Sequence, residues 1–339
     1  MSIPRTAKAS DATVDVVVVG AGIAGIACAR TLTDLGARVC IAEKSGGVGG
    51  RIATRAFVGV PFDYGAPILE ASRSPFRSVL ESLADSGVLS LESEHGSRGA
   101  FASSQGLRSA IRRYAEGLRI ELDTRVVAIE RIPTGARVRV ADGPSMDARH
   151  VVTTAPFPQS LALFGMDELS NSTRGVVFSR GLVVALLAHG DSALRDGIHE
   201  VAASGISRAR VRRLGGRILL VAYGTCALAE HMLERDDAFV VKSVLESLRF
   251  AEVARLDHID STHVKRWTYA TTTGTSSVRK WFDPDADASG KVGPRSVAGD
   301  AFGDGTVEGA WESGVAVARA LATQLGHSRL RRHSMIPGP

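Results

Sequence analysis

Three glycines and one carboxylate near the start of the chain have the types and spacing needed to bind a dinucleotide. Gly20, Gly22 and Gly25 directly follow the apolar run 16–19 and precede a stretch with helical periodicity. In this context the first glycine permits a sharp turn, the second lets backbone N–H groups approach a pyrophosphate, and the third lets helix and strand pack closely. Glu43 ends the next predicted strand, where its carboxylate can accept hydrogen bonds from an adenosine ribose. The pattern predicts a dinucleotide site, for either FAD or NAD.

Two further segments favour a flavin over a nicotinamide. Gly49, Gly50 and Arg51 follow after a short loop and bring two backbone amides and a guanidinium to the same pyrophosphate. Far downstream, Asp300 follows an apolar segment and precedes a Gly-rich loop and a helix predicted from about Val307. An acid there could hold the ribityl or phosphate end, while the helix N-terminus faces a reduced, anionic ring. A nicotinamide-only dehydrogenase, the alternative, needs no such distal clamp.

The elements that must position these residues are typical of an α/β fold. A strand over 16–19, a helix over 23–35 that stops at Gly36, and a strand over 38–42 form a βαβ start. Periodicity predicts further helices over 75–89, 107–117, 238–250 and 307–325, and strands over 120–131, 136–140, 151–154, 182–187, 217–223 and 296–298. We therefore predict a Rossmann-type cofactor domain, closed by both ends of the chain, with an inserted α+β layer.

The same pattern predicts two domains and two tails. The cofactor domain is expected to be discontinuous and to comprise residues 14–75, 98–157 and 264–325. Residues 76–97 and 158–263 are expected to form the inserted substrate domain, in which Gly-rich phosphate-type turns are absent. The small, polar segments 1–13 and 326–339 are predicted to be flexible tails.

Composition excludes several classes of protein. The 339 residues are 44% hydrophobic and 23% charged, which fits a packed globule rather than a disordered or coiled-coil chain. The formal net charge is +5, but the cations are scattered among acids without a long basic run, so no nucleic-acid partner is expected. The first dozen residues lack an apolar signal region, and no stretch approaches a membrane span. We expect a cytoplasmic protein without a membrane partner.

Cysteines and histidines indicate no metal site. The three cysteines, Cys28, Cys40 and Cys226, lie far apart and form no Cys-x-x-Cys pair. His95, His199 and His263 lack partners at ligand spacing. No metal and no disulfide framework is therefore predicted.

The motifs together resemble those of a known family. Val-Val-Gly-Ala-Gly-Ile-Ala-Gly (18–25), Glu-Lys-Ser-Gly-Gly-Val-Gly-Gly-Arg (43–51) and Phe-Asp-Tyr-Gly-Ala (62–66) look like the flavin amine-oxidase superfamily. Gly-Asp-x-x-x-x-Gly-x-Val-Glu-Gly-Ala-Trp-x-Ser-Gly (299–314) and Arg-Trp-x-Tyr-Ala (266–270) are similar to its short renalase-like branch. The resemblance implies a two-domain fold of the hydroxybenzoate-hydroxylase type, an FAD, and hydride transfer to the flavin followed by reoxidation with O₂.

The resemblance also carries over individual positions. The cofactor-binding candidates are Gly20, Gly22, Gly25, Glu43, Lys44, Gly49, Gly50, Arg51, Asp300 and Val307, together with Val126 or Val127 on a strand whose backbone meets the adenine. No cysteine lies near the C-terminal motif, so the FAD is expected to be noncovalent.

Catalytic residues are harder to read. Lys265 could hold a water near the flavin, and Trp267, Tyr269 and Tyr223 could line a pocket over its ring. The competing interpretation is that Lys265 is a solvated strand residue and the aromatics belong to the core. A flavin can take hydride directly from its donor, so no protein base is required.

The function that follows is an FAD-dependent oxidoreductase. We expect it to take a hydride from a small dihydronicotinamide-type or amine donor and pass electrons to O₂, forming H₂O₂. One alternative is an amine oxidase or desaturase that acts on a biosynthetic intermediate. An alternative of another class is a non-catalytic flavin-binding or assembly protein.

Overall fold

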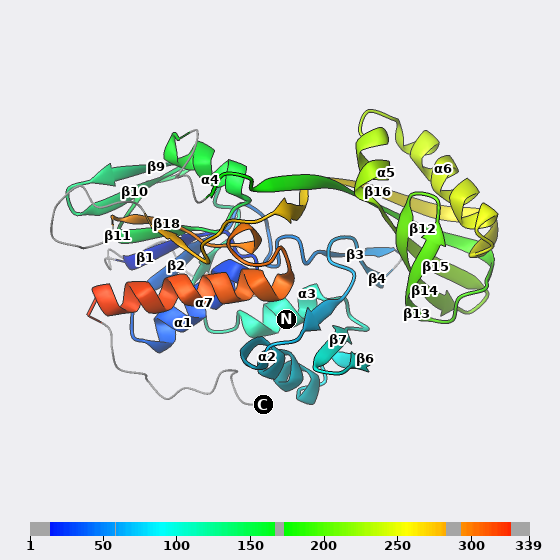
Figure 1. Cartoon of the computed structure of the whole chain (residues 1–339), viewed down its shortest axis with the longest axis horizontal. Helices are drawn as coiled ribbons and strands as arrows, with labels where there is room; N and C mark the ends of the chain where they lie inside the picture. Colours follow the sequence, from blue (N-terminus) through cyan, green and yellow to red (C-terminus); the bar gives the residue numbers. More distant parts are fainter. Residues whose placement is uncertain (1–13, 58, 167–172, 283–292, 327–339) are drawn as a thin grey trace.

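The computed structural model describes residues 14–57, 59–166, 173–282 and 293–326. Two sheets with their helices lie at opposite ends of the molecule, and two smaller sheets lie between and below them (Figure 1). The predicted tails, apart from Gly326, fall outside the described residues.

The larger sheet has eight strands and carries the glycine turn. Its strands are β1 (Val14–Val19), β2 (Val39–Ala42), β8 (Ile120–Glu121), β9 (Val126–Ile132), β10 (Gly135–Val140), β11 (Met146–Thr153), β17 (Trp281–Phe282) and β18 (Arg295–Val297). The central order β18–β11–β1–β2–β8 is parallel, and β17, β10 and β9 are added by antiparallel pairing. The single strand predicted over 120–131 is wrong: a turn at Asp123, with φ +53°, separates β8 from β9.

The valine run of β1 is explained by burial on both faces of this sheet. Val16 and Val18 pack into a core with the helices of one face, and Val17 and Val19 pack into a second core on the other face. A parallel sheet covered on both sides requires such a continuous apolar strand.

Helices cover both faces of the larger sheet. They are α1 (Ile23–Asp34), α2 (Ser74–Asp85), α3 (Arg108–Tyr114), α4 (Phe157–Phe164) and α7 (Val307–Gln324). α1 and α7 lie side by side in front of the sheet in Figure 1, although they come from opposite ends of the chain. They are so close that a Cβ at Gly314 would lie 2.2 Å from the carbonyl oxygen of Ala24. The unit built on the larger sheet is thus closed by both ends of the chain, as predicted.

The second sheet has five antiparallel strands in the order β13–β14–β15–β12–β16. Their bounds are β12 (Val177–Ser192), β13 (Gly197–Ala203), β14 (Ile206–Leu214), β15 (Arg217–Gly224) and β16 (Ala254–Gly274). On β12, Leu182, Val184 and Leu186 join the core that contains residues of α5 (Cys226–His231) and α6 (Asp237–Phe250). The alternate residues Val183, Ala185 and Leu187 form the opposite face, which meets Phe62. We call this opposite face the inner sheet face.

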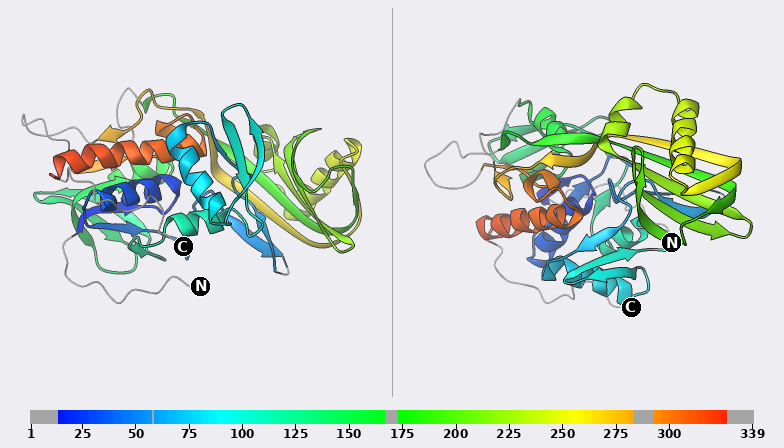
Figure 2. Two further views of the ribbon diagram at one scale, coloured as in Figure 1. Left: turned by 90° about the horizontal axis from the view of Figure 1, so that it is seen from below. Right: turned by 45° about the vertical axis from the view of Figure 1, so that its right-hand side comes forward.

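Smaller elements connect the two sheets. β3 (Thr54–Phe57) and β4 (Val60–Asp63) form a hairpin, and β5 (Leu69–Ala71), β7 (Arg98–Ala102) and β6 (Ser90–His95) form a three-stranded sheet. A short 3₁₀ helix, η2 (Asp300–Phe302), precedes α7. Both views of Figure 2 show the β3–β4 hairpin, in blue, against the five-stranded sheet.

The predicted domain boundaries fall on continuous structure. β16 pairs with β12 from Ala254 to Gly274 with bulges in between, so residues 264–274, assigned to the cofactor domain, continue a strand of the five-stranded sheet. Phe76, Leu80 and Leu83, from a segment assigned to the substrate domain, join the core of α1 and α7. The division into domains stays a prediction. Within the described part of the chain, no helix is both long and apolar enough to cross a membrane.

Candidate functional site

The first glycine turn depends on the absence of side chains. Gly20 adopts φ +105°, and its N–H donates to the carbonyl oxygen of Ala42 at 2.9 Å. A Cβ at Gly25 would lie 2.0 Å from the carbonyl oxygen of Gly20. The turn from β1 into α1 therefore requires glycine at these two positions.

Gly22 differs from its two neighbours because the space beside it is empty. A Cβ at Gly22 would meet no atom within 4 Å. Gly22 is the N-cap of α1, it offers no side-chain acceptor, and the first turn of the helix contains no acid. The N-terminus of α1 is thus an open set of N–H donors suited to an anion.

Glu43 ties the end of β2 to the glycine turn. Its Oε2 accepts from the N–H of Ala21 at 2.7 Å, and its Oε1 accepts from the N–H of Ser45 at 2.8 Å. The carboxylate is buried, whereas the side chain of Lys44 is exposed. Each carboxylate oxygen has a second lone-pair direction, so Glu43 can still accept a ribose hydroxyl.

The second glycine segment lies directly against the first. The N–H of Gly49 donates to the carbonyl oxygen of Ala21 at 2.8 Å, and Gly49 and Gly22 form an isolated parallel bridge. Gly49 and Gly50 have φ values of +116° and +58°. The two motifs therefore share one surface at the N-terminus of α1.

Arg51 and Asp300 form an ion pair across 249 positions of sequence. Arg51 Nη1 donates to Asp300 Oδ2 at 2.7 Å, and Nη2 donates to Oδ1 at 2.5 Å. Thr272 Oγ1 also donates to Asp300, and Arg51 donates to the carbonyl oxygen of Ala270 at 3.1 Å. Burial alone would raise the pKa of Asp300, but the bonds from Arg51 and Thr272 hold it below its usual range. Two predicted cofactor residues thus bind each other.

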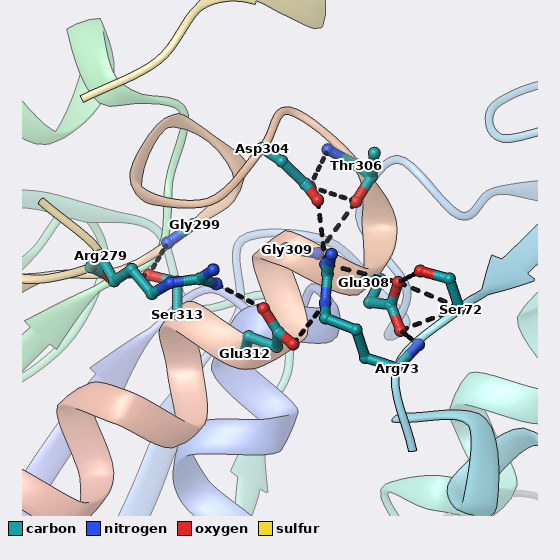
Figure 3. A network of polar contacts seen from close by, with 10 residues as sticks. All are labelled: Ser72, Arg73, Arg279, Gly299, Asp304, Thr306, Glu308, Gly309, Glu312 and Ser313. Atoms are coloured by element: carbon teal, nitrogen blue, oxygen red, sulfur yellow. Dashed lines mark hydrogen bonds and ion pairs between the residues drawn. The ribbon is translucent and has the colours of Figure 1, made fainter. Parts of the chain in front are cut away.

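A polar network fixes the start of α7, as Figure 3 shows. Glu308 is buried and accepts from the N–H of Arg73 at 2.7 Å and from Ser72 Oγ at 2.8 Å. The Arg73 guanidinium donates to Glu312 at 2.6 Å and to Asp304 at 2.9 Å. These bonds attach the first two turns of α7, and the loop before them, to the segment between β5 and α2.

The N-terminus of α7 is capped by the protein itself. Thr306 Oγ1 accepts from the N–H of Gly309 at 3.0 Å, which is an ordinary N-cap bond. Val307 is the first residue of the helix and packs against the core of α1. This helix end therefore has fewer free donors than the N-terminus of α1.

An aromatic group lies where the β3–β4 hairpin meets the inner sheet face. The rings of Tyr64 and Trp267 stack with centroids 5.9 Å apart and planes 15° from parallel. Trp267 Nε1 donates to the carbonyl oxygen of Tyr64 at 2.8 Å, and the ammonium of Lys265 lies 4.7 Å from the Trp267 ring centroid. Burial, Arg55 and Lys265 lower the pKa of the adjoining His263. Two of the four predicted pocket residues, Lys265 and Trp267, are thus in contact.

Of the other two predicted pocket residues, Tyr223 lies in the same apolar cluster as Trp267, and Tyr269 lies elsewhere. Tyr223 is buried in the inner sheet face, and its hydroxyl donates to the carbonyl oxygen of Asp63 at 2.8 Å. Burial raises the pKa of Tyr223. Tyr269 meets Phe178 edge to face at 5.7 Å, and the guanidinium of Arg51 lies over that Phe178 ring. Tyr269 is therefore close to the Arg51 and Asp300 pair rather than to Trp267.

Asp63, at the end of β4, joins this strand to two other segments. Its Oδ1 accepts from Thr54 Oγ1 at 2.6 Å and from the N–H of Leu107 at 2.9 Å. Burial raises the pKa of Asp63 to about 6, although both hydrogen bonds and Arg210 act in the opposite direction. The sequence signal was the Phe-Asp-Tyr-Gly motif, which does not reveal burial.

The predicted adenine strand lies beside Glu43. The N–H of Thr124, just before β9, donates to the carbonyl oxygen of Glu43 at 2.8 Å. Val126 is half-buried and Val127 is 46% exposed. Among the described residues, no group of histidines, cysteines and acids could hold a metal ion.

Family comparisons cover most of the chain. Residues 84–322 match the model for flavin containing amine oxidoreductases, and residues 18–83 match the model for an NAD(P)-binding Rossmann-like domain. A protein of Mycobacterium tuberculosis (strain H37Rv), provisionally named as the flavin-containing monoamine oxidase AofH, is 46% identical over 69 residues. That match spans 20% of this chain and only 15% of the relative.

Solved structures show the same fold. A protein from Exiguobacterium sp. 255-15, provisionally named as a protoporphyrinogen oxidase, has a TM-score of 0.69 and 12% identity and covers 93% of this chain and 100% of its own. Wild-type putrescine oxidase bound to putrescine has a TM-score of 0.63 and 15% identity. The match covers 92% of this chain and 99% of the putrescine oxidase chain. They confirm the predicted α/β fold with a Rossmann-type unit; the renalase-like branch stays a prediction. The family model matches well over half of this chain, and the chain therefore belongs to the flavin-containing amine oxidoreductases.

Proposed function

We propose that the chain binds FAD noncovalently and takes a hydride from a small dihydronicotinamide-type or amine donor, with O₂ as the electron acceptor. The observation that carries the proposal is the meeting of two distant glycine segments, 20–25 and 49–50, at the uncapped N-terminus of α1. When bound, FAD supplies a two-electron acceptor that O₂ can reoxidise, and two protons with the two electrons convert O₂ to H₂O₂.

The residues present fit the dinucleotide part of FAD. The empty space beside Gly22 and the free donors of α1 suit a pyrophosphate. Glu43 would accept from the adenosine ribose, and the loop before Val126 lies beside it for the adenine. Lys44 is exposed next to this position and adds a cation near the phosphates.

Arg51 and Asp300 would exchange partners when FAD binds. The guanidinium would turn part of its donor set to the pyrophosphate, and the carboxylate would accept from a ribityl hydroxyl. Thr272 and Ala270 of β16 already hold the two side chains at this place. In this proposal Val307 lies at the edge of the ring site.

The inner sheet face would position the donor. Trp267 and Tyr64 present a stacked pair of rings, and Lys265 places an ammonium beside them without an ion-pair partner among the described residues. In this proposal Trp267, Tyr64 and Lys265 orient the donor and exclude water. They do not act as a base, because direct hydride transfer needs none.

The visible spectrum of the protein as purified tests the cofactor, and anaerobic mixing with candidate donors tests the reaction. We expect a yellow protein whose flavin absorbance bleaches with one dihydronicotinamide isomer or one amine and returns with O₂. A protein that stays colourless after incubation with FAD would overturn the proposal. A yellow protein that no donor bleaches would instead favour the non-catalytic flavin-binding alternative.

One second candidate has its own support. The structural neighbours include an oxidase bound to putrescine, and the family model is that of amine oxidoreductases. An amine oxidase or desaturase acting on a biosynthetic intermediate is therefore the alternative within flavin chemistry. Bleaching by an amine and not by any dihydronicotinamide would favour it.

A further inference from the structure

A cavity of about 340 Å³ lies at the edge of the inner sheet face. It is enclosed by β4, by the β6–β7 hairpin, and by β13, β14 and β15. None of the motifs that indicate FAD binding lines it except Phe62 and Asp63. The cavity is therefore separate from the glycine segments.

Arg210 enters this cavity with unused hydrogen-bonding capacity. Its Nε is buried and has no hydrogen-bond partner. Nη1 donates to Glu92 Oε1 and Nη2 to the carbonyl oxygen of Pro67, both at 3.3 Å, which is long for a guanidinium bond. A buried donor without an acceptor is costly, so Arg210 favours a ligand that supplies one.

Arg212 adds a second guanidinium on the same side. Arg212 lies two residues after Arg210 on β14, so both side chains are on the same face of the sheet. On β15, Arg210 pairs with Val221 and Arg212 pairs with Leu219. Among the described residues, the only acceptor that Arg212 reaches is the carbonyl oxygen of Ser104 at 3.3 Å. Two planar donor forks therefore face one cavity.

Of the three acids that line the cavity, Asp196 and Glu92 are paired with arginines, and Asp63 has one carboxylate oxygen without a hydrogen-bond partner among the described residues. Asp196 accepts from the N–H and Nη1 of Arg213, and Glu92 pairs with Arg210. Asp63 uses Oδ1 for Thr54 and Leu107. The unsatisfied Nε of Arg210 and its two long Nη bonds suit a ligand that presents paired acceptor oxygens.

We propose that this cavity binds the carboxylate group of the electron donor through Arg210 and Arg212, which makes the donor an organic acid. A carboxylate matches the planar guanidinium fork, and Phe62, Leu219 and Val221 offer an apolar wall to the carbon skeleton. The part of the inference that concerns the donor rests on the proposed function.

Register connects the cavity to the aromatic pair. Val221 pairs with Ala185 on β12, and Ala185 pairs with His263 on β16, two positions before Lys265 on the same face. Asp63 of the cavity is followed directly by Tyr64, which stacks on Trp267. The cavity and the aromatic pair therefore adjoin the same apolar cluster of the inner sheet face.

Equilibrium calorimetry with acetate, butyrate and benzoate tests the site without turnover. We expect at least one of these carboxylates to bind, and benzamide, the neutral isostere of benzoate, to bind at least tenfold more weakly or not at all. Arg212→Gln and Arg210→Gln should each weaken binding at least tenfold. Arg208→Gln is the matched control, since Arg208 lies on the same strand and face but pairs with Glu200 outside the cavity.

Several results would overturn the inference. They are no binding of any of the three carboxylates, equal binding of benzamide and benzoate, or unchanged binding in both cavity variants. If Arg210→Gln fails to fold, Arg212→Gln decides. Binding in a protein that never takes up FAD would leave the anion site standing and refute the proposed function, so the two failures can be told apart.

Discussion

The glycine turn and the inner sheet face are built by different means. At the turn, backbone groups provide almost every contact, and the critical residues are those that lack a side chain, such as Gly25. On the inner sheet face, side chains from several strands provide the contacts, as in the stack of Tyr64 on Trp267. Substitution of single side chains can therefore change the chemistry of the second region, whereas the first is fixed by its backbone.

The largest expected loss of stability comes from Gly25 and not from Gly22, although both belong to the same motif. Gly25→Ala should destabilise the protein by more than about 4 kcal/mol, because the new Cβ would overlap the carbonyl oxygen of Gly20. Gly22→Ala should leave stability within about 0.5 kcal/mol but lower FAD affinity, because its Cβ would fill empty space where the pyrophosphate is proposed. Urea denaturation and flavin titration measure the two effects. Equal destabilisation by both substitutions would contradict this distinction.

The next largest loss of stability is expected from breaking the ion pair between Arg51 and Asp300, which links the two regions. Asp300→Ala should cost about 3 kcal/mol, since it leaves the Arg51 guanidinium without its buried partner. Asp147→Ala removes the partner of Arg137 at the surface and should cost less than about 1 kcal/mol. Thermal and urea unfolding compare the pair. A cost for Asp300→Ala no larger than the control would mean that the ion pair does not hold β16 and η2 to the glycine segment.

The free energy of unfolding should depend on pH through Asp63, which lies beside the inner sheet face. The pKa of Asp63 is raised from 3.8 in the unfolded chain to about 6, so folding favours its protonated form. The protonated Asp63 contributes about 3 kcal/mol to the free energy of unfolding. This contribution is complete below about pH 4 and is lost as the pH rises through 6. Asp63→Asn should flatten the free energy of unfolding between those pH values, whereas Asp147→Asn should not. An unchanged slope in Asp63→Asn would show that Asp63 ionises normally.

The smallest effect tests the aromatic pair. Trp267→Phe should cost about 1 kcal/mol, because it removes the bond from Nε1 to the carbonyl oxygen of Tyr64. Tyr269→Phe should be neutral within about 0.5 kcal/mol, since the Tyr269 hydroxyl has no hydrogen-bond partner among the described residues. Equilibrium unfolding measures both. A larger cost at Tyr269 would reverse the ranking.

The difference between the regions also explains what could be predicted from the sequence. A glycine that needs φ above zero or close backbone approach leaves a local signal, so 20–25 and 49–50 were recognisable, as was the βαβ unit around them. Glu43 was recognisable from its distance to this turn, but its bonds to Ala21 and Ser45 were not.

Contacts between distant segments left no such signal. Arg51 and Asp300 were each predicted to bind a cofactor, yet nothing in either motif indicated that they pair with each other. Arg210 lies in an alternating strand whose pattern fits any exposed edge, and its cavity forms only when the β6–β7 hairpin packs against it. The turn at Asp123 was missed because apolar residues on both sides suggested one strand.

The length of β16 has a consequence for how the two regions evolve. This one strand carries Lys265 and Trp267 on the inner sheet face and, a few residues later, Thr272 beside Asp300. A shift of its register by one residue would turn the tryptophan to the helix-covered side and at the same time remove the threonine from the carboxylate. The pairing of β16 with β12 already shifts between Trp267 and Thr271, so a change of length at this bulge must preserve the placement of both the tryptophan and the threonine.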